Sequence, residues 1–481
     1  MSHLQLWARG AVLAVAFAGF SGAALAQQGS VEVKQYDDGG IYEGTFQDGL
    51  QHGQGTYRLP SGYEYTGAFV DGEIRGQGIA RFPNGSVYEG SFAKGKPEGF
   101  GKITFADGGT FEGDWVDGKI NGSGLAIYAN GVKYEGGFKN ARHHGQGRME
   151  SPSGYVYEGD WVNGVREGQG RATYADGSVY DGGMTADKRA GQGTLSDPGG
   201  MGYDGAWADG QMHGDGVLTQ SNSDVYTGPF VNGERVGQGR VVYANGDIYD
   251  GGFDGDRRHG QGTFTGVDGN TYVGSWVAGV MEGQGRITYP DGSIYEGQFR
   301  AGLADGKGLI TYADGATYDG DWAQGVIEGM GTARYASGPV YEGAFVNAVF
   351  EGQGKLSYED GYSYDGAWMA GKRHGTGKTT FADGATYEGG FAAGDRDGSG
   401  KLTRPDGSGY DGEWKAGVKS GMGVETYANG DVYEGMFQGD KRHGQGTVRY
   451  ADGTEASGHW DGGILGDAAD GEAPTEGTAS N

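Results

Sequence analysis

The sequence contains no cysteine and little proline. With no cysteine among 481 residues, the chain forms no disulfide, no thiolate metal site and no thiol nucleophile. Only 10 residues are proline and glycine does not recur at every third position, which excludes a collagen helix. After the N-terminal segment, no apolar run reaches the roughly 20 residues that a membrane-spanning helix needs.

Positive charge is also scarce. The chain carries 37 Lys and Arg against 64 Asp and Glu, for a formal net charge of −27. Such an acidic chain repels a nucleic-acid backbone or an anionic bilayer at long range. The composition therefore predicts no nucleic-acid partner and restricts membrane contact to local basic patches.

Residues 1–26 have the pattern of a secretory signal peptide. Arg9 precedes an apolar core from Ala11 to Phe20, and Ala24 and Ala26 supply the small residues that a signal peptidase inspects. The core is about ten residues long, too short to span a bilayer as an anchor. We expect cleavage after residue 26 and export to the periplasm or the extracellular space.

Glycine is abundant and strictly placed. It accounts for 107 of 481 residues, roughly three times normal usage, while aromatic residues make up 12%. Disordered glycine-rich chains are poor in aromatics, so the composition favours an ordered, repetitive structure. One pattern recurs every 23 residues without insertion from Tyr42 to Tyr433, and a partial nineteenth unit has Ala456 in place of the tyrosine.

Each unit reads Tyr-(Glu/Asp)-Gly-x-(Phe/Trp), a loop, Gly-x-Gly, an alternating stretch, and Asp-Gly or Asn-Gly. Because side chains alternate faces along a strand, the Tyr, Gly and Phe/Trp residues share one apolar face. The Asp-Gly or Asn-Gly pair predicts a type I′ hairpin turn, with positive φ at both central residues. The sequence thus predicts an all-β fold: an elongated single-layer antiparallel sheet of about 18–19 stacked 23-residue hairpins.

The repeat also predicts the organisation of the chain. A half-repeat at 27–40 caps the N-terminal edge, the repeat array occupies 41–466, and 467–481 form a disordered acidic tail. Each unit is expected to contact only its neighbours, so there is no single globular core.

The aromatic rows form one candidate binding surface. A single sheet has nothing of its own to cover them, although twist and the glycine-aromatic interlock hide part of the row, so we expect exposure and either self-association or stacking on sugar rings. The terminal hairpins are the natural site of self-association, because their edge strands have unpaired backbone groups. The predicted repeat aromatic face includes Tyr42, Tyr88, Trp115, Tyr157, Trp161, Trp207, Trp276, Trp322, Tyr364, Trp368 and Trp414.

Cations gather three to five residues after the Phe/Trp row, where the hairpins would align them along one edge. Such an edge would engage anionic headgroups, and ordinary solvated loops are the alternative. The candidate basic edge comprises Arg142, Arg189, Arg257, Arg258, Lys372, Arg373, Lys441 and Arg442.

No catalytic, cofactor or metal site is predicted. Equivalent positions in successive units lie about 9–10 Å apart, too far for three loop histidines to converge on one ion. The carboxylates that follow the tyrosines are too sparse at this spacing for a catalytic pair, so diffuse cation attraction or solubility is their expected role. A hydrogen bond that braces the loop is the expected role of these histidines, and no Gly-x-Ser-x-Gly nucleophile motif occurs. The loop histidines are His52, His144, His213, His259, His374 and His443.

The run Tyr364-Asp365-Gly366-Ala367-Trp368, with Gly371, His374, Gly375 and Gly377, resembles the repeat of the MORN (membrane occupation and recognition nexus) family. The resemblance covers about 430 of 481 residues. It implies an elongated single-layer antiparallel sheet and roles in protein scaffolding, self-association and sometimes membrane apposition. Some units depart from the pattern, since Ala190 and Val236 replace the loop histidine.

Together these features predict an exported, non-enzymatic scaffold for protein partners, including a second copy of itself. Peripheral membrane binding through the basic edge and glycan or cell-wall binding through the aromatic rows are the alternatives. The sequence does not identify the partner.

Overall fold

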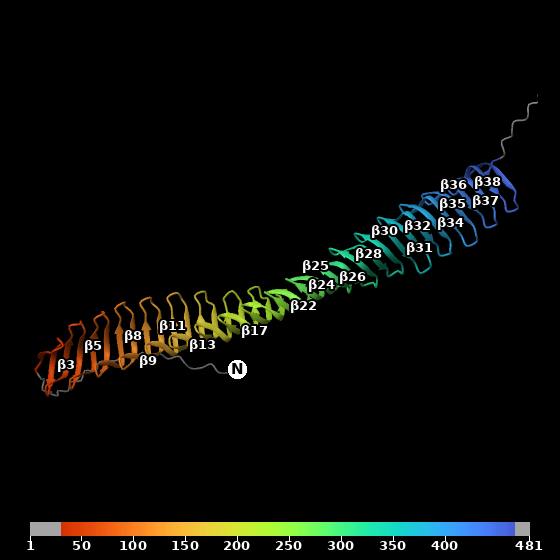
Figure 1. Cartoon of the computed structure of the whole chain (residues 1–481). Helices are drawn as coiled ribbons and strands as arrows, with labels where there is room; N and C mark the ends of the chain where they lie inside the picture. Colours follow the sequence, from red (N-terminus) through yellow and green to blue (C-terminus); the bar gives the residue numbers. More distant parts are fainter. Residues whose placement is uncertain (1–29, 467–481) are drawn as a thin grey trace, which may run out of the picture. The chain divides into compact units, whose positions relative to one another are not determined.

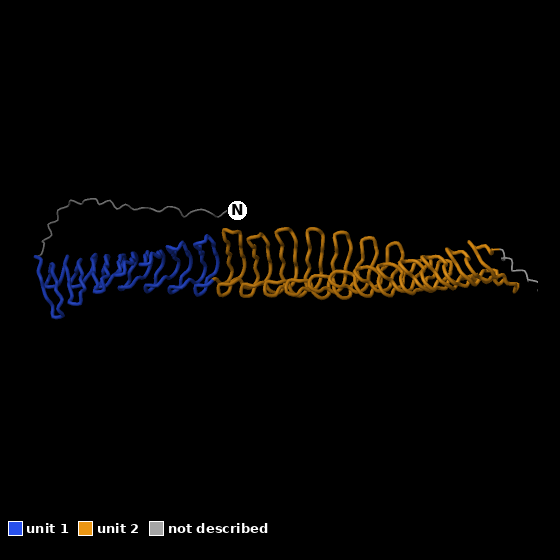
Figure 2. The backbone as a smooth tube through the Cα atoms, turned by 90° about the horizontal axis from the view of Figure 1, so that it is seen from above, with its two compact units in different colours: residues 1–188 blue, residues 189–481 orange. Residues whose placement is uncertain are grey.

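The computed structural model describes residues 30–466, which form strands and turns only. The predicted signal peptide (1–26), residues 27–29 of the predicted cap and the predicted tail (467–481) lie outside this range. Within residues 30–466, no helix is long and apolar enough to cross a membrane. The chain divides into two compact units, residues 1–188 and 189–481 (Figure 2).

In the first unit, each strand from β2 to β13 pairs antiparallel with the strands before and after it in sequence (Figure 1). Its strands are β1 (Glu32–Gln35), β2 (Ile41–Gln47), β3 (Leu50–Arg58), β4 (Glu64–Val70), β5 (Glu73–Arg81), β6 (Val87–Ala93), β7 (Lys96–Thr104), β8 (Thr110–Val116), β9 (Lys119–Ile127), β10 (Lys133–Lys139), β11 (Arg142–Glu150), β12 (Val156–Val162), β13 (Val165–Thr173) and β14 (Val179–Thr185).

The second unit repeats this plan, beginning with the pairing of β15 and β16. Its strands are β15 (Lys188–Ser196), β16 (Gly202–Ala208), β17 (Gln211–Thr219), β18 (Val225–Val231), β19 (Glu234–Arg235), β20 (Gly237–Val242), β21 (Ile248–Asp254), β22 (Arg257–Thr265), β23 (Thr271–Val277), β24 (Val280–Thr288), β25 (Ile294–Arg300), β26 (Leu303–Thr311), β27 (Thr317–Ala323), β28 (Val326–Arg334), β29 (Val340–Val346), β30 (Val349–Ser357), β31 (Ser363–Met369), β32 (Lys372–Thr380), β33 (Thr386–Ala392), β34 (Asp395–Thr403), β35 (Gly409–Lys415), β36 (Val418–Thr426), β37 (Val432–Gln438), β38 (Lys441–Arg449), β39 (Glu455–Asp461) and β40 (Ile464–Leu465).

The all-β, antiparallel hairpin array with a period of 23 residues is therefore confirmed. We number the positions of a repeat 1 to 23 from its tyrosine, so that Tyr157 is position 1 and Val179 is position 23 of the same repeat. Positions 1–6 lie on the first strand of the hairpin and positions 9–17 on the second.

The two ends of a hairpin use different turns, and the predicted assignment was wrong. The type I′ turn lies at positions 7 and 8, where Asn163 and Gly164 have φ of 52° and 93° between the paired Val162 and Val165. These two residues lie in the stretch that the sequence analysis left as an unassigned loop.

At the Asp-Gly end, only Gly177 has positive φ, at 89°. Gly177 N donates to Tyr174 O at 3.0 Å and Tyr174 N donates to Ser178 O at 2.8 Å. These bonds define a type I turn followed by a left-handed glycine, a three-residue hairpin loop. The glycine is required there by its φ, but its aspartate neighbour is not left-handed.

The core of each complete repeat is one position 1 ring packed on a pair of glycines; the ring is tyrosine in every complete repeat except one, where it is Phe111. Tyr157 is fully buried, and Gly159 and Gly170 lie opposite each other on β12 and β13 beneath its ring. A Cβ atom added to Gly170 would lie 2.5 Å from Tyr157 Cζ. The Tyr157 hydroxyl donates to the Asp160 carbonyl at 3.3 Å, so the polar end of the ring is satisfied.

The rings form a ladder that joins successive repeats. Tyr134 packs edge-on against Phe138 of its own repeat and Trp161 of the next, with centroid distances of 5.0 and 5.4 Å. Trp161 Nε1 donates to the Gly147 carbonyl at 3.2 Å. Each repeat therefore shares its core with the following one.

Side chains at position 10 cover this ladder. His143 stacks on Tyr134 with a centroid distance of 3.6 Å, and Phe350 stacks on Tyr341 at 3.7 Å. The second strand of each hairpin thus supplies a cover that the sequence analysis did not foresee.

The expectation that the aromatic face is exposed is consequently wrong. Ten of its eleven named residues are at most 6% exposed and Trp322 is half-buried. The ten are Tyr42, Tyr88, Trp115, Tyr157, Trp161, Trp207, Trp276, Tyr364, Trp368 and Trp414.

A glycine substitution tests the ring-on-glycine core. In Gly216→Ala, the new Cβ would lie 2.6 Å from Tyr203 Cζ, whereas in Gly202→Ala the nearest atom is 3.7 Å away. We expect Gly216→Ala to lower the free energy of unfolding by about 1–3 kcal/mol through overpacking. Urea unfolding followed by circular dichroism measures this, and Gly202→Ala is the matched control. Equal midpoints for the two variants would contradict the packing argument.

Candidate protein-interaction surface

An exposed apolar row flanks the type I′ turns in four successive repeats of the second unit. Positions 6 and 9 pair with each other beside the turn, as in Val277 with Val280 and Val346 with Val349. Alternation along the strands directs both positions away from the aromatic ladder. The row, which we call the apolar turn edge, comprises side chains that are 40–49% exposed: Val277, Val280, Leu303, Val326, Val346 and Val349.

Contacts between repeats make this edge continuous. Three of the four position 9 side chains, Val280, Leu303 and Val349, lie beside the turn glycine of the next repeat, and the turn after Val326 has Ala348 in place of that glycine. A Cβ atom on Gly302 would lie 3.6 Å from Val280 Cγ1, and one on Gly325 would lie 3.8 Å from Leu303 Cδ2. The apolar surface therefore runs across repeat boundaries.

Carboxylates at position 11 hold the turns of this edge in place. Glu282 Oε2 accepts the Ala301 amide of the next turn at 3.0 Å, and Glu328 Oε2 accepts the Asn347 amide at 3.0 Å. The first strands also remain paired on both sides along most of their length. The apolar side chains thus project from a pinned backbone.

The sequence analysis missed this edge, although a signal was present. When the repeats are aligned, position 9 is Val, Leu, Val and Val in four consecutive units, whereas it is Lys or Arg in seven others.

The candidate basic edge separates into two sets. Arg189, Arg258, Arg373 and Arg442 occupy position 10 and stack on aromatic rings of the next repeat, so for them the prediction of a loop-tip charge is wrong. Arg258, for example, lies 4.0 Å from the Trp276 ring centroid, and its Nη2 donates to the Gly279 carbonyl at 3.1 Å. These guanidinium groups clamp one turn to the preceding repeat.

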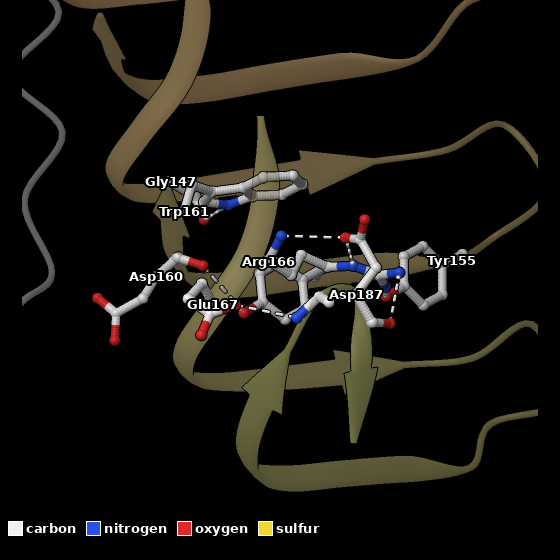
Figure 3. Close-up of polar contacts among 9 residues, drawn as sticks. Gly147, Tyr155, Asp160, Trp161, Arg166, Glu167 and Asp187 are labelled. Atoms are coloured by element: carbon white, nitrogen blue, oxygen red, sulfur yellow. Dashed lines mark hydrogen bonds and ion pairs between the residues drawn. The ribbon is translucent and has the colours of Figure 1, made fainter. Parts of the chain in front are cut away.

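Arg166 shows the same clamp in the first unit (Figure 3). Its Nε donates to Asp187 Oδ1 at 2.9 Å, and another guanidinium nitrogen donates to the Tyr155 hydroxyl. Glu167 Oε2 accepts the Ala186 amide in the same turn at 2.9 Å. Two consecutive side chains of one repeat therefore hold both residues of the next turn.

The other four residues of the candidate basic edge, at position 9, are exposed: Arg142, Arg257, Lys372 and Lys441. Arg257 and Lys372 are five repeats apart, which corresponds to about 50 Å at the strand spacing. Because charges screen over about 8–10 Å in physiological salt, these cations do not form one patch.

Position 18 carries a second aromatic row, which is half-exposed. Its members in the repeats around the apolar turn edge are 37–43% exposed: Tyr289, Tyr312, Tyr335 and Tyr358. Tyr335 contacts Phe350 edge-on with a centroid distance of 6.5 Å. These rings, and not the buried ladder, are available for stacking on a ligand.

The loop histidines share position 11 with the bracing carboxylates. His52 Nδ1 accepts the Asp71 amide at 3.5 Å, which supports the bracing role in that repeat. Among the residues that the structure describes, no three His, Asp or Glu side chains gather closely enough to hold a metal ion. His143, which precedes one of these histidines, is half-buried against the ladder, and desolvation there lowers its pKa to about 4.

These features define a repeat protein of stacked β-hairpins with a solvent-facing apolar edge. The family model for the MORN repeat matches eighteen segments, from residues 42–62 to residues 433–455. The chain therefore belongs to the MORN repeat family. No curated protein matches it.

The solved structures that resemble the chain are distant. The TCP10 domain of Danio rerio CPAP, in complex with a peptide of STIL, has 15% identity, covers 61% of this chain and 94% of its own, and gives a TM-score of 0.15. The SAS-4 TCP domain of Drosophila melanogaster, in complex with a proline-rich motif of Ana2, has 12% identity, coverage of 42% and 90%, and a TM-score of 0.21. A streptogramin B lyase has 11% identity, coverage of 61% and 91%, and a TM-score of 0.11. Such low TM-scores carry no functional inference.

The buried ladder predicts a cooperative response to alkali. Burial raises the pKa of many position 1 tyrosines from 10.0 to about 12, including Tyr65, Tyr88, Tyr157, Tyr249 and Tyr341. Because the unfolded chain releases these protons first, the stability that the tyrosines contribute is complete below pH 10. It is lost as the pH rises through about 12.

We expect the phenolate absorbance to rise, and the β-sheet circular dichroism signal to fall, over the same pH range above pH 10. The chain unfolded in denaturant is the control and should ionise near pH 10. Complete ionisation near pH 10 with an intact β-sheet signal would contradict burial of the ladder.

Proposed function

We propose that this chain is an exported, non-enzymatic scaffold that binds protein partners through the apolar turn edge. The observation that carries the proposal is the row of apolar side chains that four consecutive repeats expose beside pinned turns. Contiguous exposed apolar surface is a common mark of an interface. A pre-ordered backbone also lowers the entropic cost of binding.

The wet faces elsewhere in the array do not show this pattern. Two position 6 valines in other repeats, Val116 and Val231, are 51% and 44% exposed but have a charged residue opposite them at position 9, Lys119 and Glu234. The apolar pair Val162 and Val165 stands alone, because position 9 of the neighbouring repeats is Arg142 and Lys188. Within the apolar turn edge, Arg300 lies opposite Leu303, so the continuous apolar row is that of position 9. Continuity across repeats, and not exposure of single residues, distinguishes the apolar turn edge. This difference supplies a matched control.

A charge-insertion experiment tests the proposal. We expect Leu303→Glu with Val326→Glu to abolish the recovery of protein partners by chemical cross-linking in the native envelope. Val116→Glu with Val231→Glu adds the same charge at isolated exposed valines and should leave recovery unchanged. Recovery of the same partners from both double variants would exclude the apolar turn edge as the binding surface. Fractionation of the same cells tests export.

Membrane binding is the second candidate, and its test should use only the exposed cations. We expect the protein to show little sedimentation with anionic liposomes, because its cations are widely spaced and its net charge is negative. Strong, salt-sensitive binding that is lost in Arg257→Glu with Lys372→Glu and Lys441→Glu would favour the membrane role. Reversal of the charge at Arg258 or Arg442 would instead disturb the ladder, and a loss of binding could then result from unfolding.

Glycan binding is the third candidate. The half-exposed tyrosines at position 18 support it, since Tyr289, Tyr312, Tyr335 and Tyr358 occupy this position in four consecutive repeats. If these rings bind glycan, replacement of Tyr312 and Tyr335 by alanine should weaken binding in a cell-wall binding assay and leave partner recovery through the apolar turn edge unchanged.

A further inference from the structure

Arginine at position 10 clamps four tryptophans of the second unit in the same way. Its guanidinium group lies over the position 5 ring of the next repeat and donates to the position 8 carbonyl of that repeat. The guanidinium carbon lies 3.8–4.1 Å from the centroid of the tryptophan ring, and the hydrogen bond measures 2.8–3.2 Å. The four pairs are Arg189 with Trp207, Arg258 with Trp276, Arg396 with Trp414, and Arg442 with Trp460.

One repeat of the second unit keeps the rings of this clamp but has alanine, Ala304, at position 10. The rings of Tyr295 and Trp322 meet edge-on with a centroid distance of 5.1 Å and an interplanar angle of 81°. In the clamped repeat, the corresponding rings of Tyr249 and Trp276 are 5.4 Å apart at 83°. The ring pair is therefore built alike whether or not an arginine covers it.

The turn that carries the acceptor is also in place beside Ala304. Gly325 N donates to the Ala304 carbonyl at 2.8 Å, as Gly279 N donates to the Arg258 carbonyl at 2.8 Å. The Gly325 carbonyl is thus the equivalent of the Gly279 carbonyl, which the Arg258 guanidinium binds. The alanine side chain ends at Cβ and has no donor, so it reaches neither this carbonyl nor the face of the ring.

The missing cover leaves Trp322 unlike the other tryptophans of the ladder. Trp322 is half-buried, whereas the other seven are 4–6% exposed. Each of those seven has a residue larger than alanine at position 10 of the preceding repeat. Phe350, for example, packs edge-on against Trp368 with a centroid distance of 5.2 Å. The solvent contact of Trp322 follows from Ala304.

We propose that this vacant clamp, formed by Tyr295, Trp322 and the Gly325 carbonyl, binds the guanidinium group of a ligand. The bound group lies over the Trp322 ring and donates to the carbonyl, as the guanidinium of Arg258 does in its own repeat. The site goes beyond the proposed scaffold function. It lies on the opposite face of the sheet from the apolar turn edge, because position 9 side chains point away from the ladder.

The chemistry of the site selects a guanidinium over other charged groups. A carbonyl oxygen accepts hydrogen bonds only, and the Trp322 indole N–H already donates to the Gly308 carbonyl at 3.1 Å, so this set gives a carboxylate or phosphate no donor. An ammonium ion is compact and strongly hydrated, whereas a guanidinium is planar, weakly hydrated and able to stack on an aromatic face while it donates. The net charge of −27 also attracts a cation.

Fluorine NMR of the full chain labelled with fluorotryptophan tests the site, with Nα-acetylarginine amide as the probe. The Trp322 signal is assigned by its loss in Trp322→Phe. We expect the probe to shift the Trp322 signal until it saturates and to leave the signals of the four clamped tryptophans unchanged. Nα-acetyllysine amide at the same concentration should give a shift several-fold smaller.

A second titration distinguishes two sources of the guanidinium. Agmatine carries the group without a peptide backbone. Saturation at a lower concentration of the capped arginine would support an arginine of a peptide as the ligand. Saturation at a lower concentration of agmatine would support a free guanidino compound at the same site.

Ala304→Arg fills the site from within the chain, and we expect this variant to lose the shift that the probe induces. Leu303→Arg is the matched control, because it adds the same charge at the neighbouring residue on the opposite face and should keep the shift. The pair Lys372 and Arg373 shows that the fold accepts a cation at each of these two positions. Circular dichroism spectra equal to that of the native chain show that both variants are folded.

The converse variant, Arg258→Ala, opens a second vacant clamp. We expect the probe to shift the Trp276 signal in this variant in addition to that of Trp322. Ala304→Arg is the variant on which the test depends if Arg258→Ala does not fold, since it restores the residue found in the clamped repeats.

Three outcomes would overturn the inference. The first is a Trp322 signal that the capped arginine does not move at any concentration below those that unfold the chain. The second is an equal shift in Ala304→Arg and in the native chain, which would show binding elsewhere. The third is an equal shift with the lysine probe, which would show a general response to cations. None of these outcomes affects the recovery of protein partners through the apolar turn edge, so the two proposals fail separately.

Discussion

The structure depends on one steric relation, a tyrosine ring lying on two opposed glycines. A sheet with side chains at both glycine positions would hold the ring away from the backbone, and the ring would face water. With both glycines, the ring lies against the main chain and its hydroxyl reaches the carbonyl three residues further on, as Tyr65 does with Ala68 at 3.1 Å. A single layer of strands can thereby bury large side chains without a second layer.

Every other interface between repeats builds on the position of that ring. The ring fixes the Phe or Trp of the next repeat at its edge, and position 10 packs on its outer face. Where position 10 is arginine, the guanidinium reaches the next turn as well, as Arg396 does with the Gly417 carbonyl at 2.8 Å. Stability is therefore shared between neighbours, in the manner of linear repeat proteins. The residues of the apolar turn edge can differ from those of other repeats because they lie outside this set of contacts.

The period, the strands and their two faces could be predicted from the sequence because they follow from spacing alone. The turn types could not, because Asp-Gly suits both a type I′ turn and the end of a three-residue loop, and only the register of Tyr174 and Ser178 separates them. The burial of the ladder was missed for a related reason. Position 10 was assigned to a loop, whereas residues such as His143 and Arg258 lie on strands and fold over the rings. The apolar turn edge could be recognised in the sequence only by comparing position 9 across the repeats.

The pairing of each strand with its sequence neighbours has a consequence for how the chain is made. All-β proteins usually fold slowly because their strands pair across long stretches of sequence, and closing those stretches costs entropy. Here a complete hairpin needs only 23 residues, and each new hairpin can dock on the one before it. A chain emerging from a ribosome would have no need to wait for its C-terminus. It could lay down ordered sheet one repeat at a time while the remainder was still in transit.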